Sequence, residues 1–445
     1  MISRKKQLSL IILCWAVYTI AYLGRYSYTS NGVPIQKFYG VSKEEFSLAT
    51  TFFFFAYGAG QILNGLLCRK YNMRFMIFGA MIVSSAINIS VFIGIPFYLI
   101  KYIWLINGLC QSILWASLLR ILSCYLDDKN MNLAVLFMST TVSIGTFIIY
   151  GASAFFALFD GFKYVFLVAA AFMTAVALIW IFSFGNLTEK LRLENAKTVD
   201  KKTDGATADA AGDNLKDNAY SIGNDAESGE TQKPVRTALK GTVKGLIFLV
   251  SLFGLYAIVL NFAKDGLTTW LPQILNEQYD LSDSLSIILT IVLPLFAVFG
   301  AVTAVFVNKF VKDHSDLTGV FFAAAAVSML GIALLLKTDM WYLVLILFGV
   351  VNMLMHGANN VVTSMLPLSV GKKYNAGTVG GLLNGTCYIG STLSQYLIAY
   401  IATASGWSAV VNVLLYACVI SAAFAAITFV IRKLKNKNIR NGETI

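Results

Sequence analysis

Long runs of residues without a single charge are the feature that most limits how this chain can fold. Residues 46–68, 75–100, 131–159 and 164–187 contain no Asp, Glu, Lys or Arg. A helix needs about 20 apolar residues to cross the ~30 Å hydrocarbon core of a bilayer, and each run reaches that length. Spanning strands would instead give shorter segments with alternating polarity. The runs therefore predict an all-α, polytopic membrane protein.

Composition supports a chain that is surrounded by lipid rather than water. Hydrophobic residues make up 57% of the 445 residues, and charged residues make up 13%. Soluble domains carry about 25% charged residues, so this chain has few charges with which to cover a water-exposed surface. We therefore expect the lipid bilayer to contact most of its outer surface.

Twelve apolar segments can be separated along the chain, and they form two groups of six. The predicted spans are residues 8–30, 46–68, 75–96, 98–123, 131–158 and 164–186, followed by 242–271, 284–307, 317–336, 341–362, 378–404 and 408–431. The third and fourth spans are separated only by Gly94, Ile95 and Pro96. The basic N-terminus followed by an apolar run could also be a signal peptide. We predict a retained span, because the run continues through Tyr28 without a small-residue cleavage site.

The polar stretch between the two groups predicts a two-part organisation. We expect an N-terminal six-helix bundle at 1–186, a flexible cytoplasmic linker at 187–240, and a C-terminal six-helix bundle with a basic tail at 241–445. The linker is rich in small and polar residues and has too little apolar surface to offset its ordering entropy. A regulatory or partner-binding loop is the alternative. Transporters with two such halves bind substrate near the bilayer midplane, between the halves.

The distribution of basic residues predicts the orientation. The short segments on one side carry Arg4, Lys5, Lys6, Arg69, Lys70, Arg74, Lys129, Lys309, Lys312, Lys372, Lys373 and the basic tail 432–440, whereas the other side carries Lys37, Lys43, Lys163 and Lys337. Cytoplasmic loops carry the excess of Lys and Arg. We therefore expect a multi-pass cell-membrane protein, a monomer, with both termini in the cytoplasm. The net charge of +11 reflects this asymmetry and not nucleic-acid binding.

Motifs typical of enzymes are missing from the sequence. It has no Gly-rich phosphate loop that ends in Gly-Lys-Ser/Thr, no His-rich metal spacing and no Gly-x-Ser-x-Gly turn. The six cysteines lie in or beside apolar segments, and no pair has metal-ligand spacing. We therefore expect no enzymatic activity, no metal and no cofactor, and we expect a gradient to supply the energy for any transport.

Arg25 is the sharpest candidate among the few charged residues within spans. Such charges are costly in a bilayer and mark functional sites by default. Arg25 has Tyr22 and Tyr26 beside it, which favours the wall of a cavity over a lipid-facing surface. Its guanidinium offers a planar fork of donors that fits carboxylate or phosphate. The alternative is an interfacial arginine that extends towards the headgroups.

Lys264 lies at a similar place in the first helix of the second half, so the two cations could converge on a central cavity and bind an anion. The alternative is a local ion pair with Asp265, although adjacent helix residues do not face each other well. Asp265 or His356 could also couple transport to protons; otherwise Asp265 has a structural partner and His356 is a core histidine. Gln61 could contact substrate or form a hydrogen bond between helices.

Several segments resemble a known family of membrane proteins. Residues 65–74 resemble the loop signature between the second and third helices of the major facilitator superfamily, with Arg69 in place of the usual Asp and Asn72 in place of the usual Gly. Residues 22–25, 56–61, 108–115, 270–272 and 372–378 are similar to helices of its organophosphate:phosphate antiporter family, which includes the glycerol-phosphate and hexose-phosphate transporters. This resemblance implies twelve helices in two bundles.

The resemblance also implies roles for particular residues. The family's substrate arginine in the first helix falls on Arg25, and its arginine in the second half falls on Lys264. Its second-helix lysine falls on Gln61, and its fifth-helix histidine falls near Val142, so both of these groups are absent.

These observations lead to one main hypothesis and two alternatives. The chain would be a secondary active transporter of a small organic anion, a phosphate ester exchanged for inorganic phosphate by alternating access. The expected substrate-binding residues are Arg25, Lys264, Tyr22, Tyr26, Gln61, His356 and Tyr388. The alternatives are a proton-coupled symporter of a carboxylate or another small solute, and a membrane sensor that binds a phosphorylated ligand without transporting it.

Overall fold

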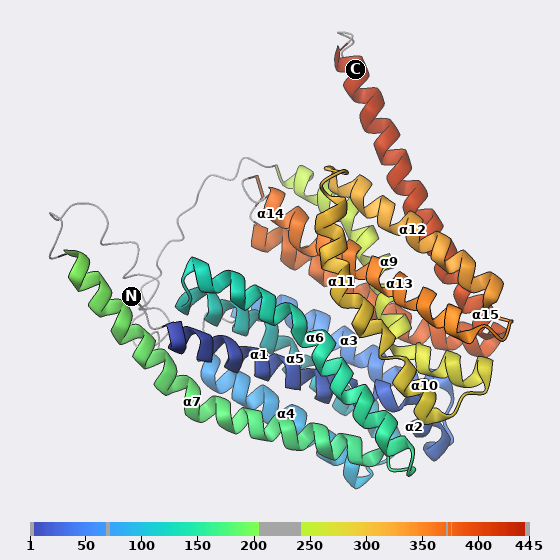
Figure 1. The fold of residues 1–445 in the computed structure, drawn as a ribbon, viewed down its shortest axis with the longest axis horizontal. Coiled ribbons are helices and arrows are strands. Elements are labelled where there is room, and N and C mark those ends of the chain that lie inside the picture. Colours follow the sequence, from blue (N-terminus) through green and yellow to red (C-terminus); the bar gives the residue numbers. More distant parts are fainter. Residues whose placement is uncertain (1–3, 68–71, 204–241, 371–372, 375, 441–445) are drawn as a thin grey trace.

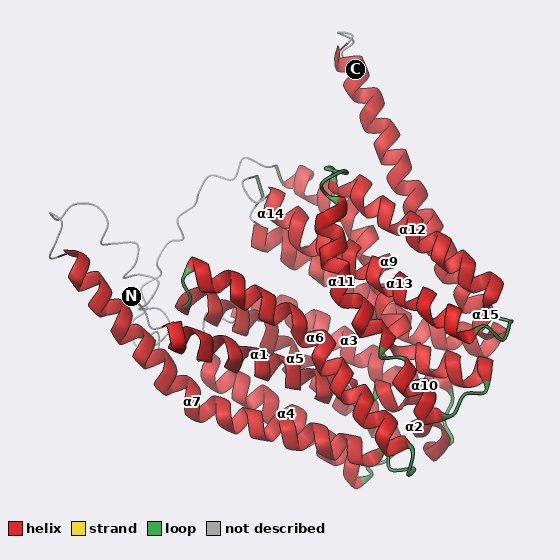
Figure 2. Cartoon of the chain, in the orientation of Figure 1, coloured by secondary structure: helices red, strands yellow, loops and turns green. Residues whose placement is uncertain are grey.

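The computed structural model describes residues 4–67, 72–203, 242–370, 373–374 and 376–440, and all regular secondary structure in these ranges is helical (Figure 2). The first half contains α1 (Arg4–Tyr26), the 3-10 turn η1 (Thr29–Asn31), α2 (Gly32–Tyr39), α3 (Lys43–Leu67), α4 (Met73–Ile93), α5 (Phe97–Tyr125), α6 (Asp128–Ala157) and α7 (Lys163–Thr203). The second half contains α9 (Val243–Tyr279), α10 (Asp283–Leu289), α11 (Val292–Val307), α12 (His314–Leu335), α13 (Trp341–Asn360), the π-helical turn η2 (Val361–Met365), α14 (Leu366–Val370) and α15 (Ala376–Arg440).

The described residues contain 11 helical segments that are long and apolar enough to cross a membrane. The last of them, Thr378–Leu434, has a backbone break at Gly406, where φ is 76° and ψ is 175°. This positive φ favours glycine, because a side chain would clash with the backbone. The break divides the segment into two arms that match the eleventh and twelfth predicted spans. The predicted all-α membrane fold is therefore confirmed, and the chain is a multi-pass membrane protein.

Local signals explain why the helices begin and end where they do. The side chains of Asp127, Thr242 and Ser282 accept hydrogen bonds from backbone N–H groups in the first turns of α6, α9 and α10. Such caps satisfy donors that have no partner within the helix. Gly94 ends α4 in a left-handed conformation, and Pro96 precedes α5. The short break predicted between the third and fourth spans is therefore present.

The predicted linker falls only partly within the described residues. Helix α7 continues to Thr203, past the predicted bundle boundary at residue 186. Residues 204–240 of the predicted linker lie outside the described ranges, so the flexible or regulatory character of this segment stays a prediction.

Hydrogen bonds and ion pairs join the two halves of the chain at the end of the molecule that lies opposite Arg4, which we call the distal end. It contains α2, the start of α10 and the bend of α15 at Gly406 (towards the lower right in Figure 1). Gln36 and Gln273 exchange two amide hydrogen bonds there, of 2.9 and 3.0 Å. Two ion pairs, Lys37–Asp283 at 2.6 Å and Lys43–Glu277 at 3.0 Å, also join the halves.

Further hydrogen bonds lie between the distal end and the middle of the molecule. Glu277 also accepts a hydrogen bond from the Trp407 indole (2.8 Å), and Ser284 donates to the backbone carbonyl of Ala154 (2.7 Å). Tyr150 of α6 donates to the backbone carbonyl of Thr268 in α9 (2.7 Å). Together with the contacts of Gln36, Lys37 and Lys43, these hydrogen bonds link the two halves in the distal half of the molecule. The structure is therefore a state in which the distal end is closed.

Candidate functional site

Arg25 lies near the distal end of α1, with only 5% of its surface exposed. Aromatic rings enclose its guanidinium. The guanidinium carbon is 4.5 Å from the ring centre of Tyr22, 4.4 Å from that of Tyr57 and 5.5 Å from that of Phe53. The faces of such rings attract a cation. Arg25 is thus enclosed within the protein, and the alternative of an arginine that extends into the headgroups is wrong.

The hydrogen bonds of Arg25 leave part of its fork unused. Its Nε donates to Oε1 of Gln111 at 3.1 Å, whereas its buried Nη2 has no hydrogen-bond partner among the described residues. No carboxylate of the described residues forms an ion pair with it. An uncompensated buried charge is costly. An anion that reached Nη2 would remove this penalty.

A buried polar network fixes Gln111 and, through it, Arg25. The amide nitrogen of Gln111 donates to Ser84 Oγ (3.0 Å) and Asn107 Oδ1 (3.2 Å). Asn107 and Asn88 both donate to the backbone carbonyl of Gly24, at 3.1 and 3.3 Å. Satisfied buried networks hold their members in one geometry. The sequence analysis missed this network; its only sequence signal is the pair of i, i+4 polar residues on each of α4 and α5.

Lys264 differs from Arg25, because it has a carboxylate partner. Its Nζ lies 3.5 Å from Oδ1 of Asp265, and the two side chains are 16% and 11% exposed. The other carboxylate oxygen of Asp265 accepts a hydrogen bond from Ser391 of α15. The ion pair considered from the sequence as an alternative is therefore present: the long lysine stem reaches its neighbour although adjacent residues point in different directions.

Tyrosines connect the surroundings of the two cations. Tyr22 is close enough to interact electrostatically with both Arg25 and Lys264, and Tyr26 interacts with Arg25 and Asp265. The Tyr57 ring lies 4.7 Å from that of Tyr388, which comes from the other half. We call Tyr18, Tyr22, Tyr26, Tyr57 and Tyr388 the tyrosine cluster; Tyr18 joins it through a 3.4 Å contact between its hydroxyl and that of Tyr57. Tyr18 and Tyr57 were not among the predicted site residues.

Gln61 and His356 lie at two edges of this region. Gln61 follows Tyr57 by one helical turn on α3, and its buried Nε2 has no hydrogen-bond partner among the described residues. The half-buried ring of His356 on α13 interacts electrostatically with Lys264, and the described residues give it no hydrogen bond. The predicted hydrogen bond between helices is therefore not seen for Gln61. Of these two side chains, His356 is the one that the described residues connect to a site cation, through its electrostatic interaction with Lys264.

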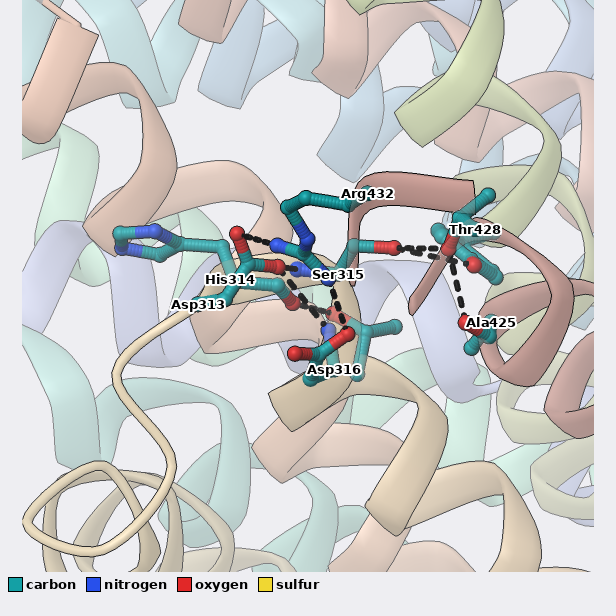
Figure 3. Close-up of polar contacts among 9 residues, drawn as sticks. Asp313, His314, Ser315, Asp316, Ala425, Thr428 and Arg432 are labelled. Carbon is teal, nitrogen blue, oxygen red and sulfur yellow. Dashed lines mark hydrogen bonds and ion pairs between the residues drawn. The ribbon is translucent and has the colours of Figure 1, made fainter. Parts of the chain in front are cut away.

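A second charged cluster lies away from these residues (Figure 3). Arg432 of α15 pairs with both Asp313 and Asp316 at the start of α12. Beside them, Ser315 and Thr428 share a 3.2 Å hydroxyl contact. Arg432 has two carboxylate partners, so the cluster ties α12 to the last arm of α15 and offers no free cation for an anionic ligand. Among the described residues, no group of three His, Cys, Asp or Glu side chains could hold a metal ion.

Comparisons with solved structures place this fold among known transporters. A bacterial homologue of the human lysosomal transporter Spinster, in an inward-facing and occupied conformation, matches with a TM-score of 0.68 and 16% identity over 98% of each chain. The unoccupied inward-facing form gives a TM-score of 0.69 at 17% identity, over 96% of each chain. The nucleoside transporter NupG matches with a TM-score of 0.67 at 12% identity, over 94% of this chain and 99% of NupG.

Sequence comparisons give the family. Proteins named sugar phosphate exchanger 3 are 22% identical over 382 residues in Bos taurus and 23% identical over 385 residues in Xenopus laevis. These matches cover 80% and 81% of this chain and 74% of each relative. The model of the Major Facilitator Superfamily matches residues 14–395. Because this match covers most of the chain, and as the segment resemblances predicted, the protein belongs to the major facilitator superfamily.

Proposed function

We propose that this protein is a secondary active transporter that exchanges a small organic phosphate ester for inorganic phosphate by alternating access. The observation that carries the proposal is Arg25, a buried cation with no carboxylate partner and an unused donor, Nη2, beside the tyrosine cluster. A guanidinium binds phosphate oxygens with two parallel hydrogen bonds. The relatives named sugar phosphate exchangers support a phosphate ester over other anions.

The binding residues come from both halves of one chain. Arg25 binds the phosphate group, and Lys264, which shares Tyr22 as a neighbour with Arg25, lies in the same region. Tyr22, Tyr26, Gln61, His356 and Tyr388 shape the remaining surface. A single chain thus supplies the whole site, which supports a monomer as the transporting unit. The excess of Lys and Arg on the side of the termini supports a cell-membrane protein with cytoplasmic termini. The distal end then faces outwards, and the described state is closed to the outside.

The arrangement supports exchange over net transport as the mode of the proposed carrier. To change the exposed side, the carrier must pass through a state in which both ends enclose Arg25. Without an anion, this state keeps an uncompensated cation out of water, which is costly. A bound phosphate compensates the charge. The loaded carrier therefore crosses more readily than the empty one, and an anion moves in each direction.

Phosphate-loaded proteoliposomes provide the direct test. We expect uptake of radiolabelled phosphate that needs internal phosphate, and we expect an external phosphate ester to inhibit it while carboxylates do not. Uptake into vesicles without internal anion, driven by a proton gradient, would support proton-coupled symport instead. Saturable binding without flux would support a sensor. Absence of exchange with every phosphate compound tested would contradict the proposal.

Gln111→Glu should impair exchange although the new side chain has nearly the same size. The carboxylate would keep the hydrogen bond to Arg25 Nε, lose the two that Gln111 donates to Ser84 and Asn107, and add a negative charge that competes with phosphate for the guanidinium. We expect the KM for phosphate to rise at least about tenfold, which corresponds to ~1.4 kcal/mol. The measurement is the concentration dependence of exchange.

Gln111→Met provides the matched control, because it removes the hydrogen bonds to Arg25, Ser84 and Asn107 without adding charge. We expect a smaller rise in KM than in Gln111→Glu, because no negative charge then competes with phosphate for the guanidinium. Equal KM values for the wild-type protein and Gln111→Glu would show that Arg25 does not bind the transported anion.

A further inference from the structure

Of the two cations at the candidate site, Arg25 and Lys264, only one lacks a carboxylate partner among the described residues. Lys264 is compensated by Asp265 at 3.5 Å, and this pair as a whole carries no net charge. The pair is held in place, because Asp265 also accepts a hydrogen bond from Ser391 on another helix. Arg25 alone remains uncompensated among the described residues of the site.

The other groups that face this pair add no charge. Tyr26 and Tyr388 interact electrostatically with Asp265, as does Cys387, and all three are neutral at pH 7 in their ordinary state. His356, which faces Lys264, is also mainly neutral at pH 7 by its ordinary value. The site therefore carries a single net positive charge, that of Arg25.

We propose that Asp265 is a specificity-determining residue, which matches the site to anions with one negative charge and disfavours anions with two. This inference rests on the proposed function and adds the charge of the species that is carried. A phosphate ester would then cross with one proton on its phosphate group, and inorganic phosphate would cross with two, so that each is singly charged.

The physical reason is the charge of the closed, loaded carrier. A monoanion at Arg25 leaves the enclosed site neutral. A dianion would leave one uncompensated negative charge in a medium of low dielectric constant, which is unfavourable. Since Lys264 is already bound to Asp265, it can compensate a second negative charge only by losing that partner. Exchange of one monoanion for another is then electrically neutral.

Anions of fixed charge test this inference without a change of pH. Methyl sulfate carries one negative charge and sulfate carries two, and neither titrates near neutral pH. In wild-type proteoliposomes that exchange radiolabelled phosphate, we expect methyl sulfate to inhibit at lower concentration than sulfate. In Asp265→Asn, which frees Lys264 and keeps an acceptor for Ser391, we expect this preference to shift towards sulfate by roughly 10- to 100-fold, the effect of one added charge near the ligand.

A double variant provides the matched control. Lys264→Gln together with Asp265→Asn removes both partners and leaves the net charge at one, so we expect it to keep the wild-type preference for methyl sulfate. If Asp265→Asn does not exchange phosphate, the same comparison is made by the stabilisation that each anion gives the purified protein against thermal unfolding.

The outcomes separate this inference from the proposed function. A wild-type preference for sulfate, or an inhibition ratio that Asp265→Asn leaves unchanged, would overturn the role of Asp265, although phosphate exchange would still stand. A failure of the wild-type protein to exchange phosphate would instead contradict the proposed function. A shift in the double variant equal to that in Asp265→Asn would also overturn the inference, because net charge would then not be the cause.

Discussion

Replacing Arg25 with alanine is expected to reduce phosphate exchange at least about 100-fold without unfolding the protein. Hydrogen bonds to a charged group contribute about 1.5–3 kcal/mol each, and a loss of ~2.7 kcal/mol corresponds to a factor of 100. Stability should not fall in parallel, because the substitution removes a buried cation that has an unused donor. The measurements are exchange in proteoliposomes and thermal unfolding of the purified variant with and without phosphate.

Arg25→Lys separates charge from geometry. Lysine keeps the positive charge but loses the planar fork and the hydrogen bond from Nε to Gln111. We expect the phosphate exchange rate of Arg25→Lys to lie between the rates of the wild-type protein and Arg25→Ala. Phosphate should raise the unfolding temperature of the wild-type protein and not that of Arg25→Ala. Wild-type exchange by a folded Arg25→Ala protein would remove Arg25 from the site.

Gly390→Val is expected to prevent normal folding. Helices α15 and α9 approach so closely at Gly390 that an added Cβ would lie 2.0 Å from the backbone carbonyl oxygen of Ile258. Neither backbone can yield without separating the two helices, and overpacking of this kind costs about 1–3 kcal/mol or more. We expect a strong loss of monodisperse protein in detergent and a lower unfolding temperature in what remains.

Gly381→Val is the matched control on the same helix. An added Cβ at Gly381 meets no heavy atom within 4 Å, and the residue is exposed. We expect near-normal yield and stability from this variant. Equal behaviour of the two variants would show that the contact between α9 and α15 at Gly390 is looser than the structure describes.

Sequence alone predicted the helical membrane fold well, because hydrophobic length is a property of each segment by itself. The runs 46–68 and 131–159 became α3 and α6 within a few residues, and the Gly94–Pro96 break was placed correctly. The two last spans were separated at the position where Gly406 bends α15. Each of these features is encoded locally and needs no knowledge of neighbouring helices.

The candidate site was harder to predict from the sequence, because it depends on which helix faces pack against each other. Arg25 stands out in the sequence as a charge within an apolar run, but its partner Gln111 lies 86 residues away and has no charge to mark it. Whether Lys264 would contact Asp265 depended on side-chain torsions that a pattern does not contain. Lys37 and Lys43 counted only as loop charges in the orientation analysis, whereas both form ion pairs with the other half.

The exposure of the ion pairs at the distal end affects how easily this end of the carrier can open. The Lys37 side chain is 61% exposed in its pair with Asp283, and exposed ion pairs contribute only about 0–1 kcal/mol each. Contacts of this kind can separate one after another, since water hydrates each ammonium or carboxylate as it leaves its partner. The Lys43 and Glu277 side chains are less exposed than that of Lys37, at 19% and 34%, so opening must also hydrate this second pair. The distal end can be closed in one half of the transport cycle and open stepwise in the other.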